Sequence, residues 1–116
     1  MTVREVRDIL GARVLVGEDH LDREVRSACG SDMMSDVLAC VTEDTLLLTG
    51  MVNSQCVRTC EMLDVPCVIF VRSKEPLADA LALAREIGLP MLKTPYTMFE
   101  SCARLYTAGL KPVELG

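Results

Sequence analysis

Residues 45–93 read TLLLTGMVNSQCVRTCEMLDVPCVIFVRSKEPLADALALAREIGLPMLK, and this stretch decides the fold. It contains three short apolar runs, at 45–49, 67–71 and 90–93, and the segments between them repeat apolar residues with the spacing of a helix. Both helical segments close on a similar sequence, Leu63-Asp-Val-Pro66 and Ile87-Gly-Leu-Pro90. Strands that alternate with helices across short loops pair in parallel through right-handed crossovers. The stretch therefore predicts an α/β fold.

The segment before residue 45 extends the same pattern. Thr2 and Glu5 have the spacing of a capping box, and glycine is the usual residue just past the end of a helix. The elements expected there are a helix that Thr2 opens and Gly11 ends, strands at 13–16 and 24–28, and a short helix over 31–40 that Ser31 or Asp32 opens.

The segment beyond residue 71 completes the architecture. We expect a helix with Pro76 in its first turn and Gly88 at its end, and a last helix that Thr97 opens and Gly109 ends. The whole pattern predicts one three-layer-like domain over residues 1–109, with a mainly parallel sheet of about four to five strands flanked by helices. Residues 110–116 are expected to form a C-terminal tail.

The composition narrows the class of protein. The 116 residues suit one domain, and 50% of them are hydrophobic. The net charge of −5 argues against binding along a nucleic-acid backbone and against an anionic membrane surface, so we expect neither partner. The first residues lack the apolar core of a signal peptide, and six cysteines fit a reducing compartment. We therefore expect a cytoplasmic protein without disulfides.

A search for catalytic motifs returns no candidate. The chain has no Gly-x-x-x-x-Gly-Lys-Ser/Thr loop, no Gly-x-Gly-x-x-Gly fingerprint and no Gly-x-Ser-x-Gly elbow, so we expect no enzyme and no cofactor. The sharpest chemical pair is Cys56 and Cys60, which share a helix face and are weak candidates for a soft metal or a redox couple. Their neighbours in the same stripe, Val57 and Leu63, favour burial instead.

The loops that follow the strands are the candidate ligand site, because open parallel sheets bind ligands beyond the carboxyl ends of their strands. These loops carry hydroxyls, helix N-termini that favour anions, and two cations. A small anionic or nucleotide-like ligand fits them, although the same hydroxyls could simply cap helices. The candidate residues are Thr49, Gly50, Asn53, Ser54, Arg72, Ser73, Lys74, Thr94 and Thr97, and Gly30-Ser31-Asp32 is a further candidate loop.

Several stretches match the motifs of one family in kind and order. They are Leu47-Leu-Thr-Gly50, Ile87-Gly-Leu-Pro90, Thr94-Pro-Tyr-Thr-Met-Phe99 and the N-terminal run from Val3. The chain from about Val3 to Leu105 thereby resembles the DRTGG domain, which is related to the N-terminal domain of HPr kinase/phosphorylase. Gly50 and Thr97 match the family pattern. The eponymous residues are largely absent, because Met51 and Val52 replace Asp-Arg, and 71–73 replace Thr-Gly-Gly.

The resemblance implies a regulatory or assembly module of a kind that is often attached to enzymes and often self-associates. It implies no kinase activity, because phosphoryl transfer in the related kinase belongs to a separate P-loop domain. We expect a homodimer that senses a small anionic ligand. The alternative is an interaction or assembly factor that binds a partner enzyme, in line with the association of some family members with anaerobic iron-hydrogenase systems. A thiol or metal protein that uses Cys56 and Cys60 is the third hypothesis.

Overall fold

A six-stranded sheet forms the middle layer of the molecule. The computed structural model describes residues 1–114, and its strand order is β1-β5-β4-β3-β2-β6. Neighbouring strands are parallel except that β1 runs antiparallel to β5. The strands are β1 (Arg13–Val16), β2 (Ser27–Gly30), β3 (Thr45–Thr49), β4 (Val68–Phe70), β5 (Met91–Lys93) and β6 (Lys111–Pro112).

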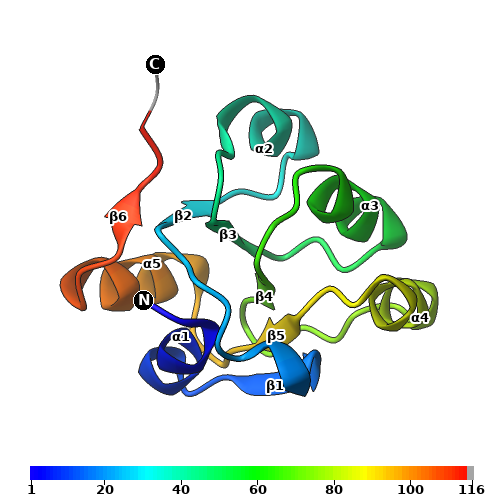
Figure 1. Cartoon of the computed structure of the whole chain (residues 1–116), viewed down its shortest axis with the longest axis horizontal. Coiled ribbons are helices and arrows are strands. Elements are labelled where there is room, and N and C mark those ends of the chain that lie inside the picture. The colour runs from blue at the N-terminus through cyan, green and yellow to red at the C-terminus, as the bar shows by residue number, and fades with distance from the viewer. Residues whose placement is uncertain (115–116) are drawn as a thin grey trace.

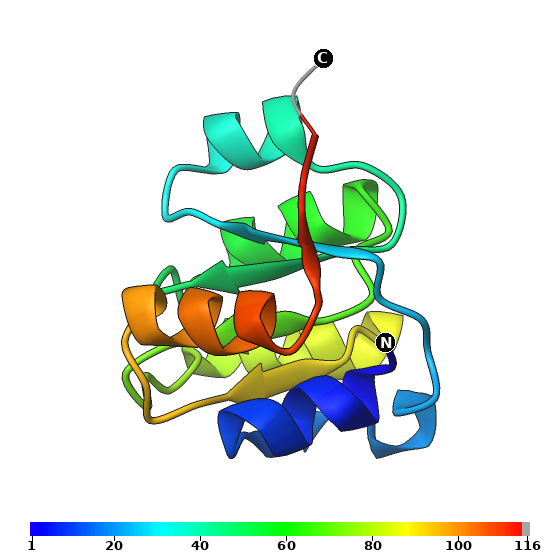
Figure 2. The same cartoon turned by 90° about the vertical axis from the view of Figure 1, so that its left-hand side faces the viewer.

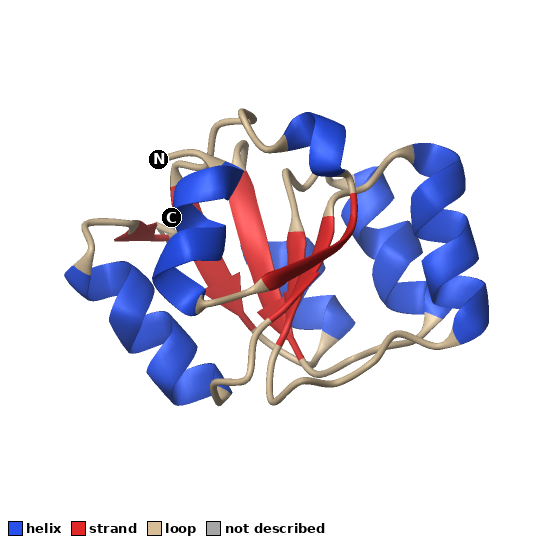
Figure 3. Cartoon of the chain, turned by 90° about the horizontal axis from the view of Figure 1, so that it is seen from below, coloured by secondary structure: helices blue, strands red, loops and turns tan. Residues whose placement is uncertain are grey.

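Five helices cover the two faces of this sheet (Figures 1 and 3). One face carries α1 (Val3–Leu10) and α5 (Met98–Thr107), and the other carries α2 (Met34–Cys40), α3 (Ser54–Met62) and α4 (Ala78–Ile87). A single 3-10 turn, η1 (Glu18–His20), follows β1. The predicted α/β fold with a mainly parallel sheet is therefore confirmed, with six strands in place of four to five.

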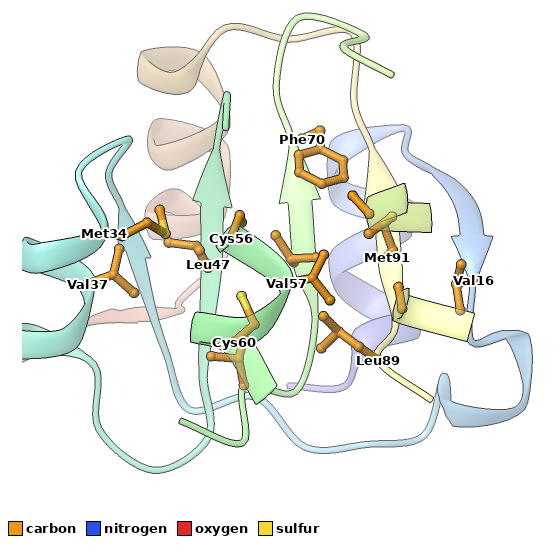
Figure 4. Close-up of a cluster of buried hydrophobic side chains, with 14 residues drawn as sticks. Val16, Met34, Val37, Leu47, Cys56, Val57, Cys60, Phe70, Leu89 and Met91 are labelled. Atoms are coloured by element: carbon orange, nitrogen blue, oxygen red, sulfur yellow. The ribbon is translucent and has the colours of Figure 1, made fainter. Parts of the chain in front are cut away.

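The continuous apolar runs in the central strands follow from this three-layer arrangement. Successive side chains of a strand point to opposite faces, and both faces here are covered by helices. Leu47 packs in the cluster under α2, α3 and α4, whereas Leu46 and Leu48 pack in the cluster under α1 and α5. Figure 4 shows the first cluster, in which Phe70 of β4 and Val57 of α3 also lie.

Several helix ends are formed by the residues that local sequence signals favour. Thr2 and Glu5 form the predicted capping box, and Gly11 ends α1 in the left-handed conformation at φ 54°. Asn53 caps α3 by accepting a hydrogen bond from the Cys56 amide. Gly88 ends α4 at φ 74°. Each cap pairs backbone groups at a helix end that would otherwise lack partners.

Two predicted boundaries near the N-terminus are wrong. The strand expected at 24–28 lies at Ser27–Gly30, because the Val25 amide donates to the Met1 carbonyl (2.7 Å) and pairing with β3 begins only at Ser27. The helix expected over 31–40 begins at Met34. Its N-cap is Met33, without a side-chain bond, because the Asp32 carboxylate points to another loop.

Two further boundaries differ in the second half. Pro76 lies outside α4, because Leu77 is the extended N-cap of that helix and its amide donates to the Val52 carbonyl at 2.9 Å. In the stretch assigned to a tail, Lys111–Pro112 forms β6 and pairs in parallel with β2, so the sheet continues past residue 109. Residues 115–116 of the expected tail lie outside the described part of the chain.

Over the described residues, no helix has the length and apolar character needed to cross a bilayer.

Candidate functional site

The carboxyl end of β3 is held by a carboxylate from the neighbouring loop. Asp32, in the loop between β2 and α2, accepts hydrogen bonds through Oδ1 from the Gly50 amide (2.6 Å) and from the Thr49 hydroxyl (3.1 Å). The Thr49 oxygen in turn accepts from the Met51 amide at 3.1 Å. These bonds join the ends of two adjacent parallel strands, at the edge of the sheet where the sequence predicts a ligand.

Lys74 reaches the same point from the loop after β4. Its Nζ donates to the Gly50 carbonyl oxygen at 3.2 Å. Gly50 is buried, and the side chains of Lys74 and Asp32 lie beside it. A Cβ placed on Gly50 would lie 3.4 Å from Lys74 Nζ and 3.4 Å from Asp32 Oδ1. Three successive strand-end loops therefore meet at Gly50. We call Asp32, Gly50 and Lys74 the Gly50 cluster.

The residues before Lys74 form a strained turn. Arg72 and Ser73 both have positive φ, at 56° and 53°, and the Lys74 amide donates to the Val71 carbonyl at 3.2 Å. A turn with both central residues in this conformation is normally built from asparagine and glycine, because residues with a larger side chain are strained there. Both the Arg72 and Ser73 side chains are exposed.

This turn is fixed to the next loop along the sheet. The Arg72 amide donates to the Tyr96 carbonyl and the Ser73 amide to the Thr94 carbonyl, each at 2.8 Å. Thr94 is buried, and its hydroxyl donates to the carbonyl of Leu10 at the end of α1 at 2.7 Å. The backbone of the turn therefore has a fixed position, and its two side chains project from it.

The nine predicted site residues divide into two groups. Thr49, Gly50 and Lys74 are in direct contact, and the Arg72–Ser73 turn adjoins them. The other four have structural positions. Asn53 caps α3, and Thr97 caps α5 by accepting from the Glu100 amide at 3.2 Å, as the alternative of helix capping predicts. Ser54 is the first residue of α3, and Thr94 joins β5 to α1.

Asp32 belongs to the cluster although it is not one of the nine predicted site residues. It lies in the further candidate loop, Gly30-Ser31-Asp32, which the sequence also predicts as the start of a helix. The signal for its role is the pairing of β2 with β3: two parallel neighbours end at one edge, so a polar side chain after the first can reach the backbone after the second.

The two candidate metal-binding cysteines are core residues. Cys56 and Cys60 are fully buried on the face of α3 that packs against the sheet (Figure 4). The hydrogen bond shared with Cys56, together with burial, raises the pKa of the Cys60 thiol, which keeps it protonated and unreactive. Within residues 1–114, no group of three or more histidine, cysteine or acidic side chains is arranged to hold a metal ion.

A second surface feature lies on the α5 side, which faces the viewer in Figure 2. Here residues of α5, β2 and β6 line a hollow of about 350 Å³. Phe99 and Tyr106 line it and are 85% and 69% exposed. The remaining lining residues are mostly apolar and include Ala28, Cys102, Ala103, Leu110 and Pro112. We call this surface the α5 face.

The sequence contains a signal for the α5 face that lies outside its motifs. Helix α5 has two apolar stripes at helical spacing. Leu105 belongs to the buried stripe, which packs against the sheet. Phe99, Cys102 and Tyr106 form the second stripe, and all three are exposed. A helix that is apolar on two faces in so small a domain indicates a second contact surface.

Comparison with known proteins places this fold in a family. A solved structure of the same fold contains the CBS and DRTGG domains of the regulatory region of Clostridium perfringens pyrophosphatase, complexed with the activator diadenosine tetraphosphate. It aligns with a TM-score of 0.69 at 14% identity, over 90% of this chain and 45% of that one, so this chain spans less than half of its length. No curated protein sequence matches. The DRTGG domain family model matches residues 5–108, and the chain therefore belongs to the DRTGG domain family, as the resemblance predicts.

Proposed function

We propose that this chain is a non-catalytic regulatory module that binds a small anionic, nucleotide-like ligand at the carboxyl ends of β3 and β4. The observation that carries the proposal is the convergence of three strand-end loops on Gly50, with Lys74 beside it and the exposed Arg72–Ser73 turn adjoining it. Ligands of open parallel sheets bind at this edge.

The local charge favours an anion although the chain as a whole carries a net charge of −5. Two cations, Arg72 and Lys74, lie within one turn. The Lys74 ammonium uses one of its three donors on the Gly50 carbonyl, and two remain for a ligand. Helix α3 begins after the loop that contains Gly50, and the N-terminus of a helix favours negative charge.

The conformation of the turn supports a role for its side chains. Two consecutive non-glycine residues at positive φ cost free energy, roughly 1–3 kcal/mol each, and such strain concentrates at functional sites. Asparagine and glycine would form the same turn with less strain. Arginine and serine at these positions are therefore best explained by the groups they present to a ligand.

The family relationship supports regulation as the role. A regulatory region that contains a DRTGG domain of this fold is complexed with a nucleotide activator in the Clostridium perfringens pyrophosphatase. For the present chain we infer the same general role, a domain whose ligand changes the behaviour of an attached or associated protein. The chain itself has no P-loop, and we propose no phosphoryl transfer.

Isothermal titration calorimetry against ATP, ADP, AMP, diadenosine tetraphosphate and pyrophosphate tests the site. We expect at least one of these to bind, and we expect Arg72→Ala and Lys74→Ala each to weaken that binding by about tenfold or more, since each removes a charge-assisted hydrogen bond. Arg85→Ala is the matched control, because Arg85 is an exposed cation in the last turn of α4, far along the helix from the site. If every compound fails to bind, or Arg85→Ala weakens binding as much, the proposal is wrong.

The α5 face favours a second function, self-association. It combines a projecting aromatic side chain, Phe99, with an apolar hollow on the same surface. A two-fold symmetric interface requires a surface that is complementary to itself, and a projection beside a hollow meets that requirement. We therefore propose that the module is a homodimer through the α5 face. A partner enzyme at the same face is the alternative.

A further inference from the structure

The Gly50 cluster presents a carboxylate as well as a cation, and this restricts the ligand it can take. Asp32 Oδ1 is occupied by the Gly50 amide and the Thr49 hydroxyl. Its Oδ2 has acceptor capacity left and lies 3.5 Å from the position that a Gly50 Cβ would occupy. Lys74 Nζ lies 3.4 Å from the same position. A ligand that reaches Lys74 therefore meets the Asp32 carboxylate next to it.

A bare inorganic anion and a nucleotide meet this arrangement differently. Pyrophosphate concentrates negative charge on both of its phosphoryl groups and has no alcohol hydroxyl, so the attraction of Lys74 is opposed by repulsion from Asp32. A nucleoside phosphate carries ribose hydroxyls near its phosphates, and a hydroxyl can donate to the carboxylate while a phosphate oxygen accepts from the ammonium. Carboxylates that accept from ribose hydroxyls are a recurrent device at parallel-sheet edges.

Asp32 is also held in place, which a specificity residue requires. The bond from the Gly50 amide is short, at 2.6 Å, and the Thr49 hydroxyl supplies a second donor. Thr49 is buried and is itself fixed by the Met51 amide. Asp32 nevertheless remains exposed, so a ligand can reach its side chain from the solvent.

We propose that Asp32 is the specificity-determining residue of this site: its carboxylate accepts a hydrogen bond from a ligand hydroxyl beside the anionic group held by Lys74, so that the site takes nucleoside phosphates and rejects inorganic anions. This inference rests on the proposed ligand function of the same loops. It adds the class of ligand and assigns a role to Asp32.

Calorimetric titration of the full chain with ADP, 2′,3′-dideoxyadenosine diphosphate and inorganic pyrophosphate tests the inference. The wild type should bind ADP at least tenfold more tightly than either of the other two. Asp32→Asn should raise the affinity for pyrophosphate about tenfold and lower the preference for ADP over its dideoxy analogue. An asparagine oxygen can still accept from the Gly50 amide, so this variant retains the contact that holds the two loops together.

The control variant is Asp36→Asn, which removes an exposed carboxylate four residues further along, in the first turn of α2. It should leave all three affinities within twofold of the wild type, and thermal unfolding should show that both variants fold. If the wild type binds ADP and Lys74→Ala weakens it, but Asp32→Asn leaves the ratio of ADP to pyrophosphate unchanged, this inference is wrong and the proposed function stands. If none of these three probes binds to the wild type, this inference is wrong, whereas the proposed function is wrong only if ATP, AMP and diadenosine tetraphosphate also fail to bind.

Discussion

Burial of the Cys67 thiol makes the free energy of unfolding depend on pH. Cys67 is fully buried just before β4, and burial raises the pKa of its thiol from an ordinary value of 9.0 to about 12. Between these values the unfolded chain has lost a proton that the folded chain keeps. Because the unfolded state then binds fewer protons, the free energy of unfolding falls as the pH rises through this range.

We predict that the free energy of unfolding of Cys67→Ala falls less steeply with pH than that of the wild type. For the wild type, this one group contributes a loss of up to about 1.4 kcal/mol per pH unit between pH 9 and 12, and the variant should lack that contribution. Urea denaturation at several pH values measures the slope, whatever the variant does to stability at neutral pH. Ser35→Ala, at an exposed position of α2 without an ionisable thiol, is the control and should keep the wild-type slope. Equal slopes in wild type and Cys67→Ala would contradict the role of burial.

Single residues also show how far sequence reasoning reaches into the candidate site. Thr49, Gly50 and Lys74 could be predicted, because their loops follow strongly apolar strands and such strands end at one edge. Asp32 could not be assigned, because its role depends on which strand lies beside β3, and adjacency of strands is a property of the whole sheet. In the sequence, Asp32 has the position of a helix cap. In the structure, its carboxylate binds the backbone of the neighbouring loop at Gly50.

At the scale of elements, the sequence predicts best where local signals are strong. The Thr2 capping box, the Thr97 cap and the Gly88 stop all lie where the pattern puts them. The boundaries that fail do so through long-range hydrogen bonds: the Val25 amide bonds to Met1 and the Leu77 amide to Val52. The fold class is therefore readable from local periodicity, whereas the ends of the shorter elements are decided by distant backbone partners.

The close approach of β1 to β5 can be tested at a glycine. Gly17, just after β1, has φ 92°, and a Cβ there would lie 2.7 Å from the Cα of Pro90, just before β5. Gly109 has φ 106° with nothing within 4 Å of its Cβ position. Gly109→Ala therefore introduces only backbone strain, about 1–2 kcal/mol, whereas Gly17→Ala adds a collision between two backbones.

We expect Gly17→Ala to lose roughly 3 kcal/mol or more of unfolding free energy, and Gly109→Ala to lose no more than about 2 kcal/mol. Urea denaturation of both variants gives the comparison directly. Similar losses in the two would mean that the antiparallel edge of the sheet adjusts easily and that the contact with Pro90 is not a constraint.

At the scale of the whole molecule, helices cover the two faces of the sheet, but no other part of residues 1–114 covers the α5 face. Growth of the sheet past β6 is a poor route to assembly, since β6 has only two residues and Pro112 lacks an amide hydrogen. Side chains are the better route. Two exposed aromatic side chains such as Phe99 and Tyr106 can bury up to roughly 300–500 Å², about half of the ~800 Å² per partner typical of a stable interface.

Self-association through this face predicts a specific pattern among charge substitutions. Phe99→Glu should convert a dimer into a monomer, because it would bury an unpaired carboxylate in the apolar hollow of the second copy. Met62→Glu is the matched control: Met62 is 74% exposed at the end of α3, in the opposite helix layer, and its replacement should leave the dimer intact. Size-exclusion chromatography with light scattering measures the molecular mass of the wild type and of both variants. A wild-type monomer at ~0.5 mM, a concentration well above the micromolar Kd of weak dimers, would contradict self-association and leave the α5 face to a different protein.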